Sequence, residues 1–112
     1  MNTENKPILL KGTGTSAGEA EGEVCIVKDA ADRSKFKEGN ILVTKITDPT
    51  MVMMMNDASA IVCDIGGITS HPSIISRELG IPCVVNTKTA TSTLKDRQKI
   101  KVNGTTGEIF LA

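Results

Sequence analysis

Residues 60–85 read AIVCDIGGITSHPSIISRELGIPCVV. The apolar runs at the two ends have the length and composition of short strands that are buried on both faces. Between them, two glycines at 66–67 precede a helix expected over residues 70–79, and Gly80 gives that helix its usual stop signal. A strand, a helix and a second strand in this order are typical of a sheet covered by helices.

The rest of the chain adds further strands and short helices, and no linker divides it. The expected strands are residues 7–11, 23–27, 41–44, 60–63, 83–85, 99–102 and 108–111. The expected helices are residues 29–37, 50–56, 70–79 and a single turn at 89–94, with a glycine-rich segment at 12–22 and a tight turn at Asn103-Gly104. About seven strands with two to four helices predict one α/β domain spanning residues 1–112.

The core has to be built almost without aromatic side chains. Phe36 and Phe110 are the only two, and there is no Trp or Tyr. This scarcity argues against single-stranded nucleic-acid binding, which depends on aromatic stacking. Met51, Met54 and Met55 share one face of a helix that begins at Thr47-Asp48-Pro49, and we interpret that face as core filler in preference to a binding surface.

The charges and cysteines exclude several function classes. Lys plus Arg equals Asp plus Glu at 13 each, so neither a nucleic acid nor a membrane surface is an expected partner. The N-terminus lacks the apolar stretch of a signal peptide, and we expect a cytoplasmic protein. Cys25, Cys63 and Cys83 are odd in number and lie in apolar runs, which indicates buried reduced thiols.

His71, the only histidine, is the strongest candidate for chemistry. It stands near the N-cap of the helix expected at 70–79, beside Thr69 and Ser70. The free N–H groups and the positive dipole end of a helix favour an anion there. A neutral imidazole nitrogen is a good nucleophile, and a phosphoryl group attached to it would face these donors. Gly66 and Gly67 allow a positive φ or a close approach at the turn before the helix.

Other interpretations of His71 remain open at this level. A lone histidine near a helix start is most often a surface residue or a satisfied hydrogen-bonding group. Metal binding is disfavoured because no second histidine and no Cys–His spacing accompanies it, so we expect no metal ligands. A Ser-His-Asp arrangement would have to draw on Ser70, Ser73 or Asp64, and nothing in the spacing selects it.

The segment 66–77, GGITSHPSIISR, resembles the signature of the phosphohistidine mobile domain of phosphoenolpyruvate-utilising enzymes. The family includes phosphoenolpyruvate synthase, pyruvate phosphate dikinase and the first enzyme of the sugar phosphotransferase system. The likeness extends to residues 12–24, 41–49 and 77–85, the last being closest to the synthase branch. It implies a swivelling β/β/α fold. Ala17, Pro72, Asn86, Arg97 and Asn103 depart from the family's usual residues. None of these departures changes Gly66, Gly67, Thr69, Ser70, His71 or Arg77.

The resemblance implies a role for each residue of the motif. His71 would be the phosphorylated residue, with Gly66, Gly67, Thr69, Ser70 and Arg77 around the phosphate. Arg77 would reach either the phosphate or a neighbouring domain. The domain itself would hold no cofactor. ATP and Mg²⁺ would bind a partner ATP-grasp domain, and a phosphoenolpyruvate/pyruvate-binding barrel domain would complete the reaction, in cis or in trans.

The resemblance implies a phosphoryl carrier that catalyses no complete reaction alone. It would pass phosphate between a nucleotide or phosphoenolpyruvate site and a pyruvate-type acceptor site. The chain would be one domain of a larger enzyme or a free-standing carrier, and its start at Met1 slightly favours the latter. The alternatives are a non-catalytic regulatory or interaction module that retains the fold, and an anion-binding module without a covalent step. The intact Thr69-Ser70-His71 sequence favours the carrier.

Overall fold

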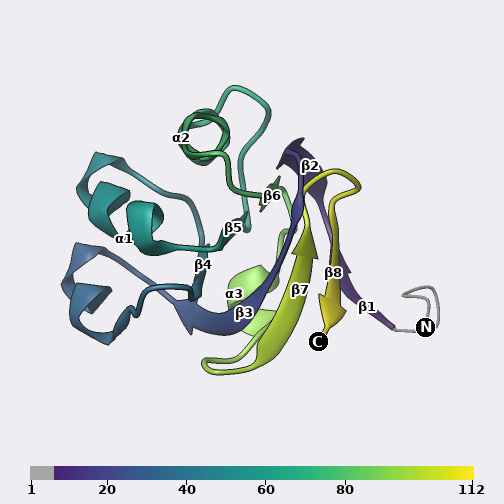
Figure 1. The fold of residues 1–112 in the computed structure, drawn as a ribbon, viewed down its shortest axis with the longest axis horizontal. Helices are drawn as coiled ribbons and strands as arrows, with labels where there is room; N and C mark the ends of the chain where they lie inside the picture. Colours follow the sequence, from purple (N-terminus) through teal and green to yellow (C-terminus); the bar gives the residue numbers. More distant parts are fainter. Residues whose placement is uncertain (1–6) are drawn as a thin grey trace.

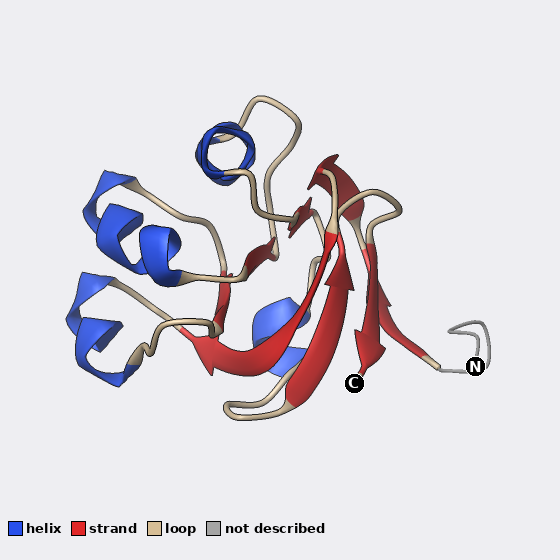
Figure 2. Cartoon of the chain, viewed as in Figure 1, coloured by secondary structure: helices blue, strands red, loops and turns tan. Residues whose placement is uncertain are grey.

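A computed structural model describes residues 7–112 as an eight-stranded sheet with short helices against it (Figures 1 and 2). The strands are β1 (Ile8–Lys11), β2 (Thr13–Ser16), β3 (Glu19–Ile26), β4 (Ile41–Thr44), β5 (Ala60–Cys63), β6 (Cys83–Val85), β7 (Lys99–Asn103) and β8 (Glu108–Leu111). The α-helices are α1 (Val52–Asp57), α2 (His71–Leu79) and α3 (Ala90–Thr93); η2 (Ala30–Lys35) and η3 (Pro49–Met51) are 3₁₀ segments. The strand order is β1-β8-β7-β3-β4-β5-β6-β2.

The middle of the sheet is parallel and follows the chain order. β3 pairs with β4, β4 with β5, and β5 with β6, all parallel. The connections between these strands carry η2, then η3 with α1, then α2, and their apolar residues pack into one common cluster. The carboxyl ends of β4 and β5 therefore lie side by side at one edge of the sheet, where ligand sites of such sheets usually form.

The two ends of the strand order come together. β1 pairs with β8 and β2 pairs with β6, although a single residue, Gly12, separates β1 from β2 in the chain. The Gly12 amide donates to Gly107 O at 2.8 Å, and the Gly104 amide donates to Gly18 O at 2.8 Å. The first strands thus lie against the β7–β8 turn and bring the sheet close to closing on itself.

Alternation along the parallel strands creates two apolar cores. In β4, Ile41 and Val43 face a core that includes Ala90 and Ile100, whereas Leu42 faces the opposite core with Met55 and α1. β5 and β6 alternate in the same way, and every residue of β4, β5 and β6 is buried. The first core lies between strands and α3, the second between the sheet and the helices on its other face, which gives the β/β/α layering.

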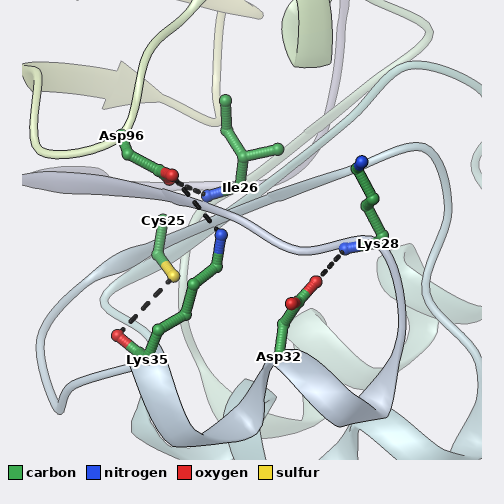
Figure 3. Close-up of polar contacts among 6 residues, drawn as sticks. All are labelled: Cys25, Ile26, Lys28, Asp32, Lys35 and Asp96. Atoms are coloured by element: carbon green, nitrogen blue, oxygen red, sulfur yellow. Dashed lines mark hydrogen bonds and ion pairs between the residues drawn. The ribbon is translucent and has the colours of Figure 1, made fainter.

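A set of polar contacts fastens the first connection to β3 (Figure 3). The Asp96 carboxylate accepts the Ile26 amide at 2.7 Å and pairs with Lys35 Nζ at 3.4 Å. The Asp32 carboxylate accepts the Lys28 amide at 2.7 Å, and the hydrogen bond is the main reason why its pKa is lowered. The Cys25 thiol lies 3.9 Å from Lys35 O. The loop before β7 is thereby held against η2 and β3.

Most of the secondary structure expected from sequence is confirmed, and the mixed α/β class with it. The expected strands at 41–44, 60–63, 83–85 and 108–111 have the predicted bounds. Met51, Met54 and Met55 are buried, as a core-filling face requires, whereas Met53 is exposed. The three cysteines are buried and form no disulfide. Between residues 7 and 112, no helix is long and apolar enough to cross a membrane.

Three local expectations need correction. The segment 12–22 is not merely a glycine-rich connection, because it forms β2 and the first half of β3. The segment 29–37 forms a 3₁₀ helix of six residues that Asp29 caps through the Ala31 amide. The turn at Asn103 spans four residues in place of two, because the Asn103 side chain accepts the Thr105 and Thr106 amides and so stabilises a wider turn.

At Gly104, the close contact between the β7–β8 turn and the rest of the sheet leaves no room for a side chain. A Cβ there would lie 1.9 Å from Ser16 O and 2.8 Å from Cys83 N, both backbone atoms. We expect Gly104→Ala to lower the free energy of unfolding by about 3 kcal/mol, the upper end of overpacking costs. Urea unfolding of Thr105→Ala is the control, because that change removes only one exposed hydrogen bond, worth about 1 kcal/mol. Equal midpoints for the two variants would contradict the close approach.

Candidate functional site

The candidate site is built on the loops that follow β4 and β5. Backbone pairing continues beyond the two strands: the Asp64 amide donates to Thr44 O, and the Ile65 amide to Lys45 O, each at 3.1 Å. Thr47 follows in the first loop, and the second loop leads through Gly66 to His71. The parallel register of β4 and β5 therefore brings residues 24 positions apart into contact.

Thr47 and His71 meet at this edge of the sheet. Thr47 Oγ1 lies 2.7 Å from His71 Nδ1, so one ring nitrogen is committed to a hydrogen bond within the domain. Thr47 is buried and His71 is half-buried. The contact fixes the orientation of the ring, and Nε2 is the ring nitrogen that takes no part in it.

Thr47 is a site residue that the sequence analysis missed. The analysis saw Thr47 only as part of a helix-start signal, but Asp48 is the residue that caps: its Oδ1 accepts the Thr50 amide at 2.8 Å. The Thr50 hydroxyl bonds to the same carboxylate oxygen. The Thr47 hydroxyl is thereby free to contact His71. The adjacent capping pair Thr-Asp was the available signal, because a helix needs only one of the two as its cap.

Helix α2 starts one residue earlier than it would if His71 were the N-cap residue. Ser70 is the N-cap residue, and His71 and Pro72 are the first two helical residues. Ser70 makes no side-chain capping bond to the helix. Its Oγ turns back instead, donating to Gly67 O at 2.7 Å and accepting the Gly67 amide at 3.2 Å. The first turn of this nine-residue helix therefore has no side-chain cap, and its N–H groups are those of His71 and the fully buried Ser73, because Pro72 has none.

The two glycines of the loop have different constraints. Gly66 has φ +130°, and a Cβ on it would lie 2.9 Å from Ser70 Oγ and 3.3 Å from Val85 Cβ. Gly67 has nothing within 4 Å of such a Cβ. The expectation of a positive φ or a close approach therefore holds for Gly66, while Gly67 faces open space beside the helix start.

The side chains of Ser73 and Arg77 hold this loop in place. Ser73 is fully buried, and its Oγ donates to Gly67 O at 2.7 Å and lies 2.8 Å from Thr15 Oγ1. Arg77 donates from Nη2 to Ile68 O at 2.7 Å and from Nη1 to Thr15 O at 2.8 Å. Thr15 belongs to β2, so the loop is tied to an edge strand far away in sequence. Ser73 and Thr15 are further residues that the sequence analysis did not assign to the site.

The predicted phosphate-binding residues lie close together along the chain, but they differ in exposure and in the hydrogen bonds that they already make. Thr69 is exposed at the end of the loop. The hydroxyl proton of Ser70 and two donors of Arg77 are already used in holding the loop. Phosphate binding by Gly66, Gly67, Thr69, Ser70 and Arg77 stays a prediction, and for Ser70 and Arg77 the observed contacts are structural ones.

Two rival arrangements can be compared with the geometry. In a Ser-His-Asp triad, Asp64 would orient His71, but the Asp64 carboxylate accepts the Thr91 amide at 2.9 Å and the Thr91 hydroxyl at 2.6 Å. The ring nitrogen that a triad aspartate would bind is taken by Thr47. Within residues 7–112, no group of three His, Cys, Asp or Glu side chains is arranged to hold a metal ion.

The pKa shifts of neighbouring groups indicate which of them can act as nucleophiles. Burial raises the pKa of the Cys63 thiol well above its ordinary value, and burial also raises the pKa of Cys83. Both thiols therefore remain protonated and are poor nucleophiles. Hydrogen bonds from Thr50 lower the pKa of the Asp48 carboxyl, and a positive charge on His71 lowers it further.

Comparison with known proteins shows which family this chain belongs to. The family model described as "PEP-utilising enzyme, mobile domain" matches residues 36–107, more than half of the chain. Phosphoenolpyruvate synthase of Pyrococcus furiosus is 51% identical over 107 residues, which cover 96% of this chain and 13% of that protein. An uncharacterised phosphotransferase of Bacillus subtilis is 46% identical over 108 residues, again 96% of this chain and 13% of that protein.

A solved structure extends the agreement to three dimensions. The solution structure of an Enzyme I protein (nEIt) superposes with a TM-score of 0.60 at 29% identity, covering 70% of this chain and 32% of that chain. This chain spans 13% of the length of the two curated relatives, so it corresponds to one domain of those larger proteins. The chain belongs to the family of mobile domains of phosphoenolpyruvate-utilising enzymes.

Proposed function

We propose that this chain is a phosphoryl carrier in which Nε2 of His71 is transiently phosphorylated. The observation that carries the proposal is the 2.7 Å contact between Thr47 Oγ1 and His71 Nδ1. It occupies one ring nitrogen from inside the domain, and the half-buried ring offers the other to an incoming donor. Membership of the mobile-domain family supports a carrier role in preference to a static binding module.

The transfer consists of two displacement steps at phosphorus. First, the lone pair of Nε2 attacks the phosphorus of the donor, the N–P bond forms, and the leaving oxygen departs with the electron pair of the broken P–O bond. The proton stays on His71 Nδ1, which donates a hydrogen bond to Thr47 Oγ1. The charge on the phosphorylated ring therefore faces a hydroxyl oxygen. Second, an acceptor oxygen attacks phosphorus, and the N–P electron pair returns to Nε2. The covalent intermediate divides one difficult transfer into two easier ones.

The start of α2 supplies the electrostatic environment for the phosphoryl oxygens. Ser70 does not cap the first-turn N–H groups of His71 and Ser73 (Pro72 has none), and the positive end of the helix dipole lies at the same place. Thr69, exposed beside them, adds a hydroxyl donor. Gly67 leaves open space where a Cβ would stand. Charge-assisted hydrogen bonds to phosphate are roughly twice as strong as neutral ones, so even a few donors suffice.

The donor and acceptor sites belong to other domains in this proposal. The matched relatives extend far beyond the segment that this chain covers. We propose an ATP-grasp domain that holds ATP and Mg²⁺ and a barrel domain that holds phosphoenolpyruvate or pyruvate, joined in cis or in trans. The name of the Pyrococcus relative, phosphoenolpyruvate synthase, supports a pyruvate-type acceptor.

The direct test is to map the phosphoryl group. We expect His71 alone to be labelled when the domain is incubated with its partner domains and labelled ATP or phosphoenolpyruvate. Mass spectrometry under alkaline conditions preserves phosphohistidine and identifies the residue. His71→Ala should fold normally, because an exposed or half-buried position contributes little to stability. Label on Thr69 or Ser70 with His71 unmodified would refute the carrier mechanism.

Thr47→Val tests the positioning of the ring. The substitution keeps the branched shape but removes the hydroxyl that His71 contacts. We expect phosphorylation of His71 to slow about 10- to 100-fold, since a hydrogen bond to a charged group is worth about 1.5–3 kcal/mol. Thr44→Val is the matched control, a buried threonine in β4 that does not contact His71. Equal labelling rates in the two variants would show that Thr47 does not support the reaction.

Substitutions at Gly66 and Gly67 distinguish two effects, backbone strain in the loop and access of phosphate to the site. Gly66→Ala should lower the free energy of unfolding by about 1–2 kcal/mol, because alanine disfavours a positive φ. Gly67→Val should leave the melting temperature almost unchanged, since its side chain meets open space. We nevertheless expect Gly67→Val to abolish labelling of His71 by filling the phosphate site. A folded Gly67→Val domain that is labelled at the wild-type rate would refute this placement of phosphate.

A further inference from the structure

A pocket opens at the carboxyl ends of β3 and β4. It has a volume of about 340 Å³ and is lined by Ile26, Val27, Lys28, Thr44, Lys45 and Thr91. Ligand sites in proteins commonly have volumes of about 300 to 1,000 Å³. Crevices outside the carboxyl ends of the strands are also where open α/β sheets usually bind ligands. We call this cavity the β3–β4 pocket.

Every charged side chain that lines the β3–β4 pocket is positive. Lys28 and Lys45 are exposed, and no carboxylate belongs to the lining. Figure 3 shows the side chains of Ile26 and Lys28 on one side of the backbone and the Asp32 carboxylate on the other, where it accepts the Lys28 amide. Between residues 7 and 112, neither lysine forms an ion pair. The two ammonium groups therefore give the mouth of the pocket a positive potential, which attracts anions.

The rest of the lining is aliphatic or carries a hydroxyl: Ile26, Val27, Thr44 and Thr91. Aliphatic surface favours an apolar body, because burying such a body removes apolar area from water. A lysine ammonium is a compact point charge and attracts an anionic group without requiring a planar partner. The pocket therefore favours an organic anion over both a neutral apolar molecule and inorganic phosphate.

A smaller pocket of about 150 Å³ shows the difference. Its charged lining residues carry both signs: Glu23, Lys35, Lys37, Asp96 and Arg97. Lys35 and Asp96 already pair with each other at 3.4 Å. The charges of this smaller pocket partly neutralise one another, whereas those of the β3–β4 pocket add.

The β3–β4 pocket is bonded to the start of the loop that leads to the candidate site. Thr44 O accepts the Asp64 amide and Lys45 O accepts the Ile65 amide, each at 3.1 Å. Thr91 donates to the Asp64 carboxylate from its amide at 2.9 Å and from its hydroxyl at 2.6 Å. Three lining residues are thus bonded to the first two residues of that loop. A ligand that holds these three residues in place also holds the start of the loop.

We propose that the β3–β4 pocket binds a small organic anion with an apolar body, and that the bound anion stabilises the start of the loop that carries His71. The apolar body lies against the aliphatic wall, and the anionic group lies at Lys28 and Lys45. Opening of the loop start breaks its bonds to Thr44, Lys45 and Thr91 and disrupts the pocket, so a ligand that binds only the closed form opposes opening. This site goes beyond the proposed phosphoryl transfer, and it requires no phosphorylation of His71.

The test uses two fluorescent probes that differ in charge. Anilinonaphthalene sulfonate joins an aryl body to one sulfonate, and phenylnaphthylamine is the same body without the sulfonate. Both are titrated into the 112-residue chain. Lys28→Gln with Lys45→Gln removes both charges of the pocket. Lys37→Gln with Lys99→Gln is the control, because it removes two exposed lysines that do not line the pocket and changes the net charge equally.

We expect the sulfonate probe to bind the wild-type chain at least about 10-fold more tightly than the neutral probe. The Lys28→Gln/Lys45→Gln variant should lose about 10-fold in affinity for the sulfonate and none for the neutral probe, since two exposed ion pairs together supply a factor of this size. The control should lose less than about 2-fold. Absence of sulfonate binding, equal wild-type affinities for the two probes, or equal losses in the two variants would each overturn the proposal.

Nuclear magnetic resonance locates the probe and follows the loop. The amide signals of the six lining residues should shift most when the sulfonate is added. At a free probe concentration of about ten times Kd, linkage predicts that hydrogen exchange of the Asp64 and Ile65 amides slows about 10-fold. Shifts centred on Lys35 and Lys37 would place the probe in the smaller pocket and overturn the proposal. Unchanged exchange at Asp64 and Ile65 with the β3–β4 pocket occupied would overturn the stabilisation of the loop.

Discussion

The contact between Thr47 Oγ1 and His71 Nδ1 depends on the parallel pairing of β4 with β5. Each strand is only four residues long, and all eight residues are buried. Burial on both faces fixes the register, because a slip by one residue would exchange the side chains of the two cores. The pairing of Thr44 with Cys63 then determines where the next residues of each loop begin. The relative position of Thr47 and His71 is thus set by the packing of aliphatic side chains.

The division of tasks at the helix start follows from which hydroxyls are already used. Asp48 caps η3, and this frees Thr47 for His71. Ser70 bonds back to Gly67 and leaves the first turn of α2 uncapped. Thr47 and Ser70 are both of a residue type that favours N-cap positions, yet neither side chain caps a helix. Helix α2 gives up its side-chain cap, and because Pro72 has no N–H, the uncapped amides of the first turn are those of His71 and the fully buried Ser73.

The sequence predicted the central strands well and the site only in part. Residues 41–44, 60–63 and 83–85 are apolar runs buried on both faces, so composition alone defines them. β2, with the sequence Thr-Gly-Thr-Ser, was missed because it has no apolar strand pattern. Its Gly14 is required by a close approach to Gly104, which no local pattern reveals. Asn86 has φ 58°, as expected of a residue that tolerates left-handed backbone. The glycine pair, Ser70 and His71 form one local motif, whereas Thr47 and Thr15 reach the site only through tertiary structure.

The anchoring of the loop also limits which motion can serve a carrier. Arg77 holds Ile68 O and Thr15 O together, and Ser73 holds Gly67 O from a fully buried position. Moving the loop alone would break these bonds, and the fully buried Ser73 hydroxyl would lose its Gly67 acceptor at a cost of about 1–3 kcal/mol. Moving the domain as a rigid body breaks none of them. The nearly closed sheet, with its glycine contacts between β2 and the β7–β8 turn, favours rigid-body movement further, because bending the sheet would separate backbones already in contact. If His71 visits two distant sites, its displacement therefore has to come from the segments that connect this domain to its neighbours, and the geometry around Nε2 is the same at both sites.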